Sequence, residues 1–506
     1  MSHVKRGGTA AVAAALLLAG CTQTVTGGGS PSQSSTPTNS ASHLDWQPCP
    51  TDPAPTKQCA TLGVPFDYAR PDVGTFQLAV ARIPAEGPAD QRIGSLFWDA
   101  GGPGGPGVAS MDSFLTRLSA SVKSRFDLVS WDPRGIGETT PALVDCDQPW
   151  PARPARVAAP NWARVQTAYS KQLSEANTRC QAANQSFINY MGTNKVVQDL
   201  DRLREAVGDQ KLTFWATSYG TRIGYVFAMR YPDRVRAILM DGNIDPHGSY
   251  AGLSEGGVAP DDALRFMRRN YPSGYQTIMR TADALTARPL LLDDGRLFSR
   301  WNYLDLVQDN IWSQSNWPVY ADTTARVLLA RRNNPAGRAE RANMAQAMDL
   351  PNSNAGGAFS VVNCLDYAER MTQSQQAAVV SANARSAPVF GGSLTLQYAA
   401  GCDGLDLQPD PVPLLGSARS RRIVAEIPVM LSNATADAMT PMLWALRMQQ
   451  AFDRPMIKYR SGQHTVWEAV RSACVNDPIN RFMLTSREPR PATCPFVPPT
   501  NSKGLP

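Results

Sequence analysis

Histidine is scarce in this 506-residue chain, which holds only 4 of them, and no CxxC pair occurs. Once an N-terminal leader is set aside, His43, His247 and His464 remain. Structural and catalytic zinc sites are built from clustered His and Cys side chains. The sequence therefore disfavours a metal site, and we expect neither a metal nor another cofactor.

The chain also lacks a strong excess of one charge. It carries 49 Lys and Arg against 43 Asp and Glu, and the excess is dispersed along the sequence. This distribution argues against nucleic acid as a partner, and the sequence indicates no obligate protein partner. With 43% hydrophobic residues the chain is expected to fold, and its length favours two lobes over one core.

A long apolar run is missing, because the only leader-like run, residues 10–18, is too short to span a bilayer. It follows Lys5 and Arg6 and precedes Leu-Ala-Gly-Cys21, which resembles a bacterial lipobox. We expect a lipoprotein signal peptide at 1–20, lipidation of Cys21, and a flexible Gly/Ser/Thr/Pro-rich tether at 21–44. The protein would then be exported and anchored on the outer side of the cell membrane, in the cell envelope. Cleavage elsewhere, with Cys21 incidental, is the alternative.

Eight cysteines remain when Cys21 is excluded. An even number in an exported chain indicates four disulfides. Eight cysteines allow 105 connectivities, of which pairing between sequence neighbours is the simplest: Cys49–Cys59, Cys146–Cys180, Cys364–Cys402 and Cys474–Cys494.

Short apolar runs bounded by Gly, Pro and Asp predict strands at 76–83, 95–98, 126–131, 212–216, 237–240, 427–431 and 456–459. Runs that are apolar on both faces are typical of a mostly parallel sheet covered by helices. Helix-like segments lie between several of them, which predicts an α/β fold. The strand pattern lapses between Met240 and Ile427, where helix-like segments take over. We expect a core in two parts, 45–241 and 426–506, with a helical cap inserted at 242–425.

One predicted strand, 212–216, runs through Ala-Thr-Ser218-Tyr-Gly220 directly into a helix-like segment. A nucleophile elbow needs this context, with small residues two before and two after the serine. The sequence departs from the strict GxSxG pattern at Ala216, where the pattern has glycine, but alanine is small enough to keep the geometry of the elbow. A strict match surrounds Ser254, but turn-forming residues precede it. We therefore predict Ser218 as the nucleophile; the alternative is a helix N-cap.

A serine nucleophile needs a base, usually a histidine held by a carboxylate. His464 lies in a glycine-containing loop after the last predicted strand, and Asp437 lies just past the strand at 427–431. Both fit the chain order Ser, Asp, His. The alternative for Asp437 is a turn residue that caps a helix, and Asp241 is the second choice for the acid.

The oxyanion of an acyl-transfer reaction needs backbone N–H donors. The amide of Tyr219 follows the nucleophile, and a glycine-rich loop follows the strand at 95–98, where Gly102 is our second donor.

The same loop also matches GxGxxG, a dinucleotide-binding pattern, through Gly102, Gly104 and Gly107, with Asp132 at the end of the next strand. Pro103 and Pro106 remove two N–H donors, and no clean helix is expected at the last glycine. Dinucleotide binding is therefore disfavoured.

With these residues in hand, the chain resembles the tripeptidyl aminopeptidase and proline iminopeptidase group of α/β-hydrolases. It is closest to actinobacterial members that include the mycobacterial cell-envelope serine hydrolases called carboxylesterase A. The resemblance covers the chain from about Asp45 onward and rests on G-G-P-G-G-P-G at 101–107, W-D-P-R-G-I-G at 131–137, A-T-S-Y-G-T-R-I-G at 216–224, T-A-D-A-M-T-P at 435–441 and G-Q-H at 462–464.

The resemblance implies an α/β-hydrolase fold with a helical lid before Ile427, and it assigns Ser218, Asp437 and His464 as nucleophile, acid and base. Two positions depart from the group's pattern. Ala100 stands where His or Asn commonly opens the glycine loop, and Glu138-Thr139 stands where Ser often follows the D-x-R-G-x-G motif.

The expected function is hydrolysis through an acyl-enzyme on Ser218, with a peptide or an ester as substrate. An exopeptidase must hold a free α-amine, for which Asp366 and Glu369 are candidates; a solvated helix face is the simpler interpretation of both. The aromatic residues of the cap, Trp301, Trp312 and Trp317, keep a carboxylesterase or lipase open as an alternative. A non-catalytic binding lipoprotein is the third possibility.

Overall fold

The computed structural model describes residues 44–50, 56–349, 356–466 and 472–499. The predicted signal peptide, most of the predicted tether, Cys21 and His43 lie outside these residues. The strands are β1 Gln47–Pro48, β2 Gln58–Asp67, β3 Arg70–Ile83, β4 Gly94–Asp99, β5 Phe126–Trp131, β6 Leu212–Thr217, β7 Val235–Asp241, β8 Leu290–Leu291, β9 Leu297–Phe298, β10 Val429–Ala434, β11 Met456–Tyr459 and β12 Ala492–Cys494.

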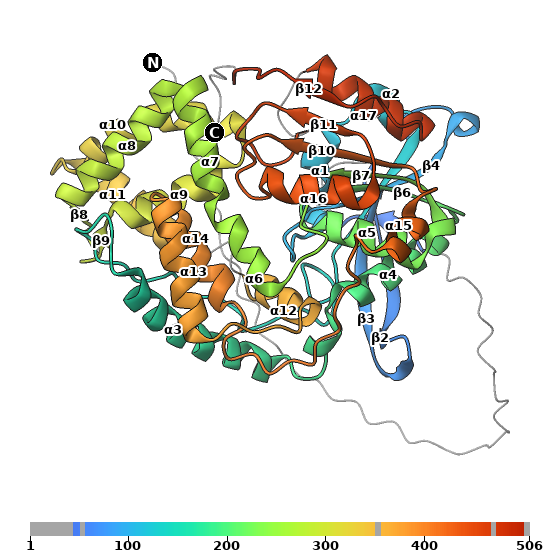
Figure 1. Cartoon of the computed structure of the whole chain (residues 1–506), viewed down its shortest axis with the longest axis horizontal. Helices are drawn as coiled ribbons and strands as arrows, with labels where there is room; N and C mark the ends of the chain where they lie inside the picture. Colours follow the sequence, from blue (N-terminus) through green and yellow to red (C-terminus); the bar gives the residue numbers. More distant parts are fainter. Residues whose placement is uncertain (1–43, 51–55, 350–355, 467–471, 500–506) are drawn as a thin grey trace, which may run out of the picture. The chain divides into compact units, whose positions relative to one another are not determined.

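Helices alternate with these strands before β7 and after β10, and they fill most of the chain between the two (Figure 1). They are α1 Gly107–Leu115, α2 Ala120–Lys123, α3 Trp162–Ala183, α4 Thr193–Ala206, α5 Gly220–Arg230, α6 Tyr250–Leu253, α7 Ala259–Asn270, α8 Pro272–Ala287, α9 Arg300–Ile311, α10 Thr323–Ala330, α11 Pro335–Asp349, α12 Gly357–Asp366, α13 Gln373–Ser386, α14 Gly391–Ala400, α15 Ala418–Val424, α16 Met442–Phe452 and α17 Ala473–Thr485.

One large sheet forms the core, with the strand order β1-β2-β3-β5-β4-β6-β7-β10-β11-β12. The strands from β5 to β12 in this order run parallel, whereas β1, β2 and β3 are antiparallel to their neighbours. Adjacent residues of β6, Phe214 and Trp215, belong to separate apolar clusters. Since neighbouring side chains of a strand point to opposite faces, the sheet is covered on both sides, as expected. The predicted mostly parallel α/β architecture is confirmed.

Helices α6 to α14, together with α3, form the unit that we call the cap. It has an apolar cluster of its own, centred on α7, α8 and α9. Helix α3 precedes the predicted cap boundary at 242, yet it packs on α13 and α14 (Figure 1), and the Gln166 side chain donates to that of Gln376 at 2.8 Å. Helix α3 therefore packs with helices of the predicted cap although it lies outside 242–425.

The described cysteines form the four disulfides predicted from sequence proximity. The pairs are Cys49–Cys59, Cys146–Cys180, Cys364–Cys402 and Cys474–Cys494. Of the helices in the described ranges, none has the length and apolar character that crossing a membrane requires.

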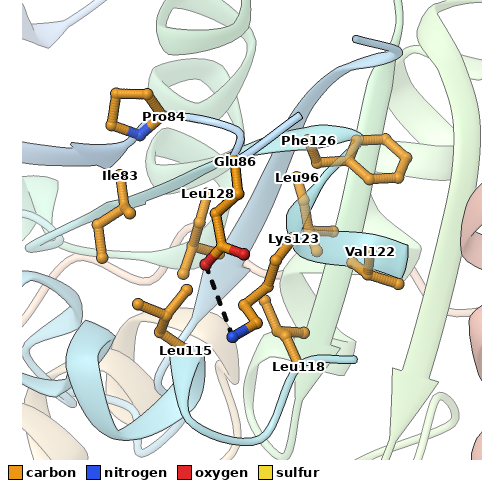
Figure 2. Close-up of a pocket in the computed structure, with 10 residues that line it drawn as sticks. All are labelled: Ile83, Pro84, Glu86, Leu96, Leu115, Leu118, Val122, Lys123, Phe126 and Leu128. Carbon is orange, nitrogen blue, oxygen red and sulfur yellow. Dashed lines mark ion pairs between the residues drawn. The ribbon is translucent and has the colours of Figure 1, made fainter. Parts of the chain in front are cut away.

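A small cavity of about 10 Å³ is lined by apolar side chains and by the ion pair between Glu86 and Lys123 (Figure 2). The two charged groups are 3.6 Å apart, and Leu96 and Leu128 are among the residues that line the cavity. This space is no larger than a water molecule needs, so it is a packing defect of the core rather than a binding site.

The W-D-P-R-G-I-G motif supplies a buried cation that joins three parts of the core. The Arg134 side chain is fully buried and donates to the carboxylate of Asp199 on α4 at 2.6 Å. It also donates to the carbonyl oxygens of Pro65 and Phe66 on β2, at 2.8 and 2.6 Å. The arginine of this motif therefore has a structural role.

Arg134→Met should destabilise the fold strongly, because it leaves the Asp199 carboxylate buried without its cation. A loss of about 3–5 kcal/mol in the free energy of unfolding is expected, measured by denaturant unfolding with the disulfides intact. Arg265→Met is the matched control, since Arg265 forms an exposed pair with Asp262 and should change stability by less than about 1 kcal/mol. Equal effects of the two substitutions would contradict this role for Arg134.

Candidate active site

Ser218 lies in a sharp turn between β6 and α5. Its φ of 57° is in the left-handed region, which non-glycine residues rarely adopt. The turn is held by the Ser218 N–H, which donates to the carbonyl oxygen of Asp241 at 2.8 Å, and by the Thr221 hydroxyl, which donates to the carbonyl oxygen of Ser218 at 2.7 Å. This is the backbone geometry of a nucleophile elbow.

The small residues around the serine allow α5 to approach the sheet. Ala216 is fully buried, and a Cβ placed on Gly224 of α5 would lie 3.3 Å from the Ala216 methyl. A Cβ on Gly220 would lie only 2.8 Å from a carboxylate oxygen of Asp99. Alanine at position 216 is therefore accommodated because glycine stands opposite it. Ser254 of the strict GxSxG match is buried in the cap, in the 3-10 helix Ser254–Val258, and does not line the cavity described below.

His464 and Asp437 form a close pair at the same edge of the sheet. The Nδ1 atom of His464 is 2.8 Å from Oδ1 of Asp437, whose side chain is fully buried. The Asp437 carboxylate also accepts the N–H groups of Thr440 at 2.8 Å and Thr465 at 2.9 Å. With Nδ1–H donated to the carboxylate, Nε2 of the neutral ring faces away from Asp437 as an acceptor. Asp437 thus fixes both the ring and the loop that carries it.

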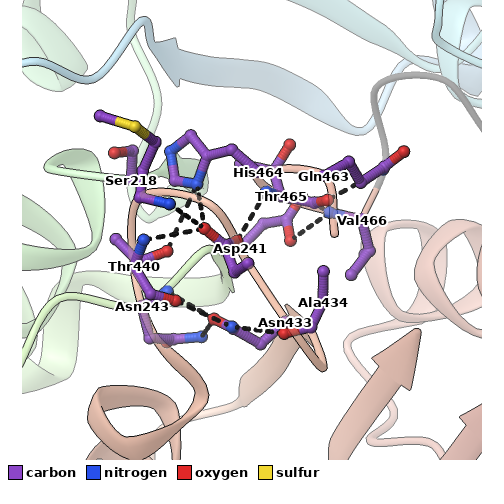
Figure 3. Close-up of polar contacts among 12 residues, drawn as sticks. Ser218, Asp241, Asn243, Asn433, Ala434, Thr440, Gln463, His464, Thr465 and Val466 are labelled. Atoms are coloured by element: carbon purple, nitrogen blue, oxygen red, sulfur yellow. Dashed lines mark hydrogen bonds and ion pairs between the residues drawn. The ribbon is translucent and has the colours of Figure 1, made fainter. Parts of the chain in front are cut away.

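Asp241, the second choice for the acid, holds the backbone instead. Its carboxylate accepts the hydroxyl of Ser432 at 2.8 Å and the N–H of Val466 at 2.9 Å. Its carbonyl oxygen accepts the N–H of Ser218, so this residue links the serine turn to the loop that carries His464 (Figure 3).

Ser218 and His464 both line a cavity of about 620 Å³ between the carboxyl edge of the sheet and the cap. The glycine loop at residues 100–106, Tyr219 and Arg222 line its core side. Aromatic side chains contribute much of the remaining wall: Trp312, Phe359, Tyr398 and Trp444. Of the three tryptophans singled out in the sequence only Trp312 reaches the cavity, because Trp301 and Trp317 are buried in the apolar cluster of the cap.

Gly102 and Tyr219, the predicted oxyanion donors, also line this cavity. Gly102 has a φ of +111°, so the glycine loop takes a path that other residues rarely follow. A Cβ on the preceding residue, Gly101, would lie 3.1 Å from the Cβ of Ser218. The loop therefore packs directly on the serine, and oxyanion binding by the two amides stays a prediction.

The two carboxylates proposed to bind an α-amine lie elsewhere. Asp366 is buried and accepts the Arg222 guanidinium and the Thr193 hydroxyl, at 2.8 and 2.6 Å. The solvated-face interpretation is therefore wrong for Asp366. The sequence of α12 alone does not show this burial, because the partner, Arg222, lies on another helix. Glu369 is exposed and follows α12, which ends at Asp366. Neither residue lines the cavity.

Asp309 on α9 is the only carboxylate among the described residues that line the cavity. The sequence gives no local signal for this position, because the residues of α9 have the pattern of an ordinary amphipathic helix. Its position depends on contacts of the cap with the core: the N–H of His464 donates to the carbonyl oxygen of Trp312, which follows α9, at 2.7 Å. A pattern within α9 cannot reveal this contact.

The GxGxxG match has a structural explanation. Contrary to expectation, a helix does begin at the last glycine, since α1 starts at Gly107. The Asp132 carboxylate caps this helix by accepting the N–H of Val108 at 2.9 Å, and it also accepts the N–H of Glu138 at 2.8 Å. Asp132 is thus committed to the fold rather than available for a ribose. Over the described ranges, no group of three or more His, Cys, Asp or Glu side chains is arranged to hold a metal ion.

A mostly parallel sheet, a strained serine turn and a cap inserted before the last strands define the α/β-hydrolase class of folds. Residues 101–466 match the model of the alpha/beta hydrolase fold family, and the chain belongs to this family.

The relatives agree with the group that the motifs resemble. The serine protease Hip1 of Mycobacterium tuberculosis is 36% identical over 248 residues, which cover 47% of this chain and 46% of that protein. The chain therefore spans less than half the length of the Hip1 proteins that it matches. The tripeptidyl aminopeptidase of Streptomyces lividans is 26% identical over 89% of this chain and 86% of its own length. Carboxylesterase B of Mycobacterium tuberculosis is 28% identical over 86% and 85%. Among solved structures, a Mycobacterium smegmatis proline iminopeptidase covers 84% of this chain and 98% of its own, with 11% identity and a TM-score of 0.36.

Proposed function

We propose that this protein is a serine hydrolase that cleaves peptides from a free N-terminus through an acyl-enzyme on Ser218. The observation that carries the proposal is the 2.8 Å pair between His464 and Asp437, on the cavity that the strained Ser218 also lines. A buried carboxylate that fixes the tautomer and orientation of a histidine is what a serine nucleophile requires.

In the first half of the reaction, the hydroxyl oxygen of Ser218 attacks the substrate carbonyl carbon, and its proton moves to Nε2 of His464. Asp437 stabilises the imidazolium that forms. The amides of Gly102 and Tyr219 donate to the oxyanion, and each such donor contributes about 10² to 10³ in rate. The imidazolium then protonates the leaving amine as the carbon–nitrogen bond breaks, which leaves an ester on Ser218.

In the second half, water attacks the ester and gives one proton to His464, which returns it to the Ser218 oxygen as the acid product leaves. Both halves use the same donors and the same base, so ester and peptide substrates share the machinery. The residues that line the cavity therefore determine whether an ester or a peptide is preferred.

Asp309 favours a peptide with a free α-amine, rather than an ester, as the substrate. Among the described residues that line the cavity, Asp309 is the one carboxylate and Arg222 the one arginine or lysine, and a carboxylate in this position offers a binding partner for an ammonium group. The relatives named tripeptidyl aminopeptidase support the same choice over most of the chain length. Asp309, in place of Asp366 and Glu369, is therefore the carboxylate that we propose for amine binding.

Ester hydrolysis is the second candidate. The aromatic wall formed by Trp312, Phe359, Tyr398 and Trp444 suits an apolar acyl group, and one relative is named a carboxylesterase.

Export to the cell envelope is part of the proposal. Four disulfides are typical of an oxidising compartment outside the cytoplasm. The lipobox-like segment adds anchoring through acyl chains on Cys21, which would hold the enzyme on the membrane.

Ser218→Ala should abolish covalent labelling by a fluorophosphonate probe and lower turnover by about 10⁶, because the proposed acyl-enzyme forms on the Ser218 oxygen. Ser254→Ala is the matched control and should leave the labelling rate unchanged. Gel fluorescence and intact mass measure the adduct. Labelling that persists in Ser218→Ala would refute the nucleophile, and a wild-type protein that neither labels nor turns over any substrate would be a binding lipoprotein.

Asp309→Asn should raise KM for peptides with a free N-terminus by about 10-fold or more, since a hydrogen bond to a charged group contributes about 1.5–3 kcal/mol. N-acetylated peptides and simple esters should be unaffected. Glu369→Gln, which removes an exposed carboxylate outside the cavity, is the control and should change none of these constants. If Asp309→Asn leaves KM for free peptides unchanged, or if wild type cleaves acetylated peptides equally well, amine recognition at Asp309 is wrong and the esterase is favoured.

A further inference from the structure

Asp99 is a buried acid that the proposed reaction does not use. It is the last residue of β4, next to Ala216 of β6 in the sheet, and it is 2% exposed. Its place at the carboxyl edge puts it beneath both the glycine loop and the start of α5.

The Asp99 carboxylate touches both segments that form the predicted oxyanion site. Its Oδ1 atom accepts the N–H of Gly101 at 2.9 Å, and this oxygen would lie 2.8 Å from a Cβ on Gly220. Gly101 in turn packs on Ser218, and its carbonyl oxygen accepts the N–H of Gly105 at 3.0 Å. One carboxylate oxygen therefore anchors the first residue of a closed turn that contains Gly102.

This carboxylate has no cation among the described residues. Its one hydrogen-bond donor in these ranges is the Gly101 amide. The titratable side chain that interacts with it is Tyr219, which immediately precedes α5 and whose own pKa is raised well above 10 by burial, so that it stays neutral. Burial raises the pKa of Asp99 to about 7. The protonated form is therefore well populated at neutral pH, and asparagine closely matches its shape and charge.

We propose that Asp99 is a positioning residue that holds the Gly101 amide and thereby aims the Gly102 N–H at the oxyanion beside Ser218. This inference rests on the proposed acyl-enzyme reaction and assigns a function to an acid that none of the sequence motifs explains. The requirement is an acceptor oxygen at this point, not a negative charge.

The experiment compares Asp99→Ala, which removes the acceptor, with Asp99→Asn, which keeps an acceptor oxygen. Asp127→Ala is the matched control, because Asp127 also accepts a backbone N–H, that of Ala85 at 2.9 Å, but lies at the opposite end of β5 from the cavity. For each variant, kcat and KM for a p-nitrophenyl ester and the rate of fluorophosphonate labelling are measured, with melting temperature as a check of folding.

Asp99→Ala should lower kcat and the labelling rate by about 10- to 100-fold, part of the contribution of one oxyanion donor, with KM changed less than about twofold. Asp99→Asn should stay within about threefold of wild type, and Asp127→Ala should keep wild-type kcat. If Asp99→Ala does not fold, Asp99→Leu, which has the branching and the number of heavy atoms of aspartate but no acceptor, replaces it.

Wild-type kcat in the variant without an acceptor would overturn the proposal, and so would an Asp99→Asn variant as slow as Asp99→Ala. Ser218→Ala is assayed alongside. Turnover that survives Ser218→Ala would refute the acyl-enzyme itself, which is a separate failure.

Discussion

The left-handed backbone at Ser218 is the constraint on which the rest of the site depends. A strand can pass into a helix within two residues only if the helix packs close to the sheet, and the glycines of α5 at 220 and 224 allow this approach. Because parallel strands end at one edge, the turn then stands beside the loops after β10 and β11. Those loops carry Asp437 and His464, which come together at 2.8 Å although more than 200 residues separate them from the serine.

Carboxylates at strand ends hold the loops around the cavity. Each accepts a backbone N–H of a loop residue or, for Val108, of the first turn of α1, and so satisfies a donor that no strand pairs with. The acids and their donors are Asp99 with Gly101, Asp132 with Val108, Asp241 with Val466, and Asp437 with Thr440 and Thr465. Only Asp437 also bonds the histidine. The cap is tied to this edge by the buried pair of Arg222 on α5 with Asp366 on α12, so the same helix that presents the serine also anchors the cap.

Patterns within a segment predict the strands and the serine turn, because the local sequence determines these features. Every predicted strand exists, because continuous apolar runs are typical of a sheet covered on both faces, and Ser218 stands out because a strand meets a helix at that residue. Strand β2 was missed, since it lies towards the antiparallel edge of the sheet and mixes polar residues with Gly63 and Pro65. The start of α1 at Gly107, the burial of Asp366 and the position of Asp309 depend on contacts with distant elements. No pattern within those segments reports such contacts, so the sequence pointed to Asp366 and Glu369 for amine binding, and neither of them lines the cavity.

The central claim is that Asp437, through His464, makes Ser218 a nucleophile. Its most direct measurement is the rate of acylation by an activated ester in Asp437→Asn and Asp241→Asn, two buried acids at the same edge of the sheet. Asp437→Asn should slow acylation by about 10³ to 10⁴ while KM changes little, because the wrong tautomer of His464 is then favoured. Asp241→Asn should slow it by no more than about tenfold. A loss in Asp241→Asn equal to or greater than that in Asp437→Asn would contradict the assignment.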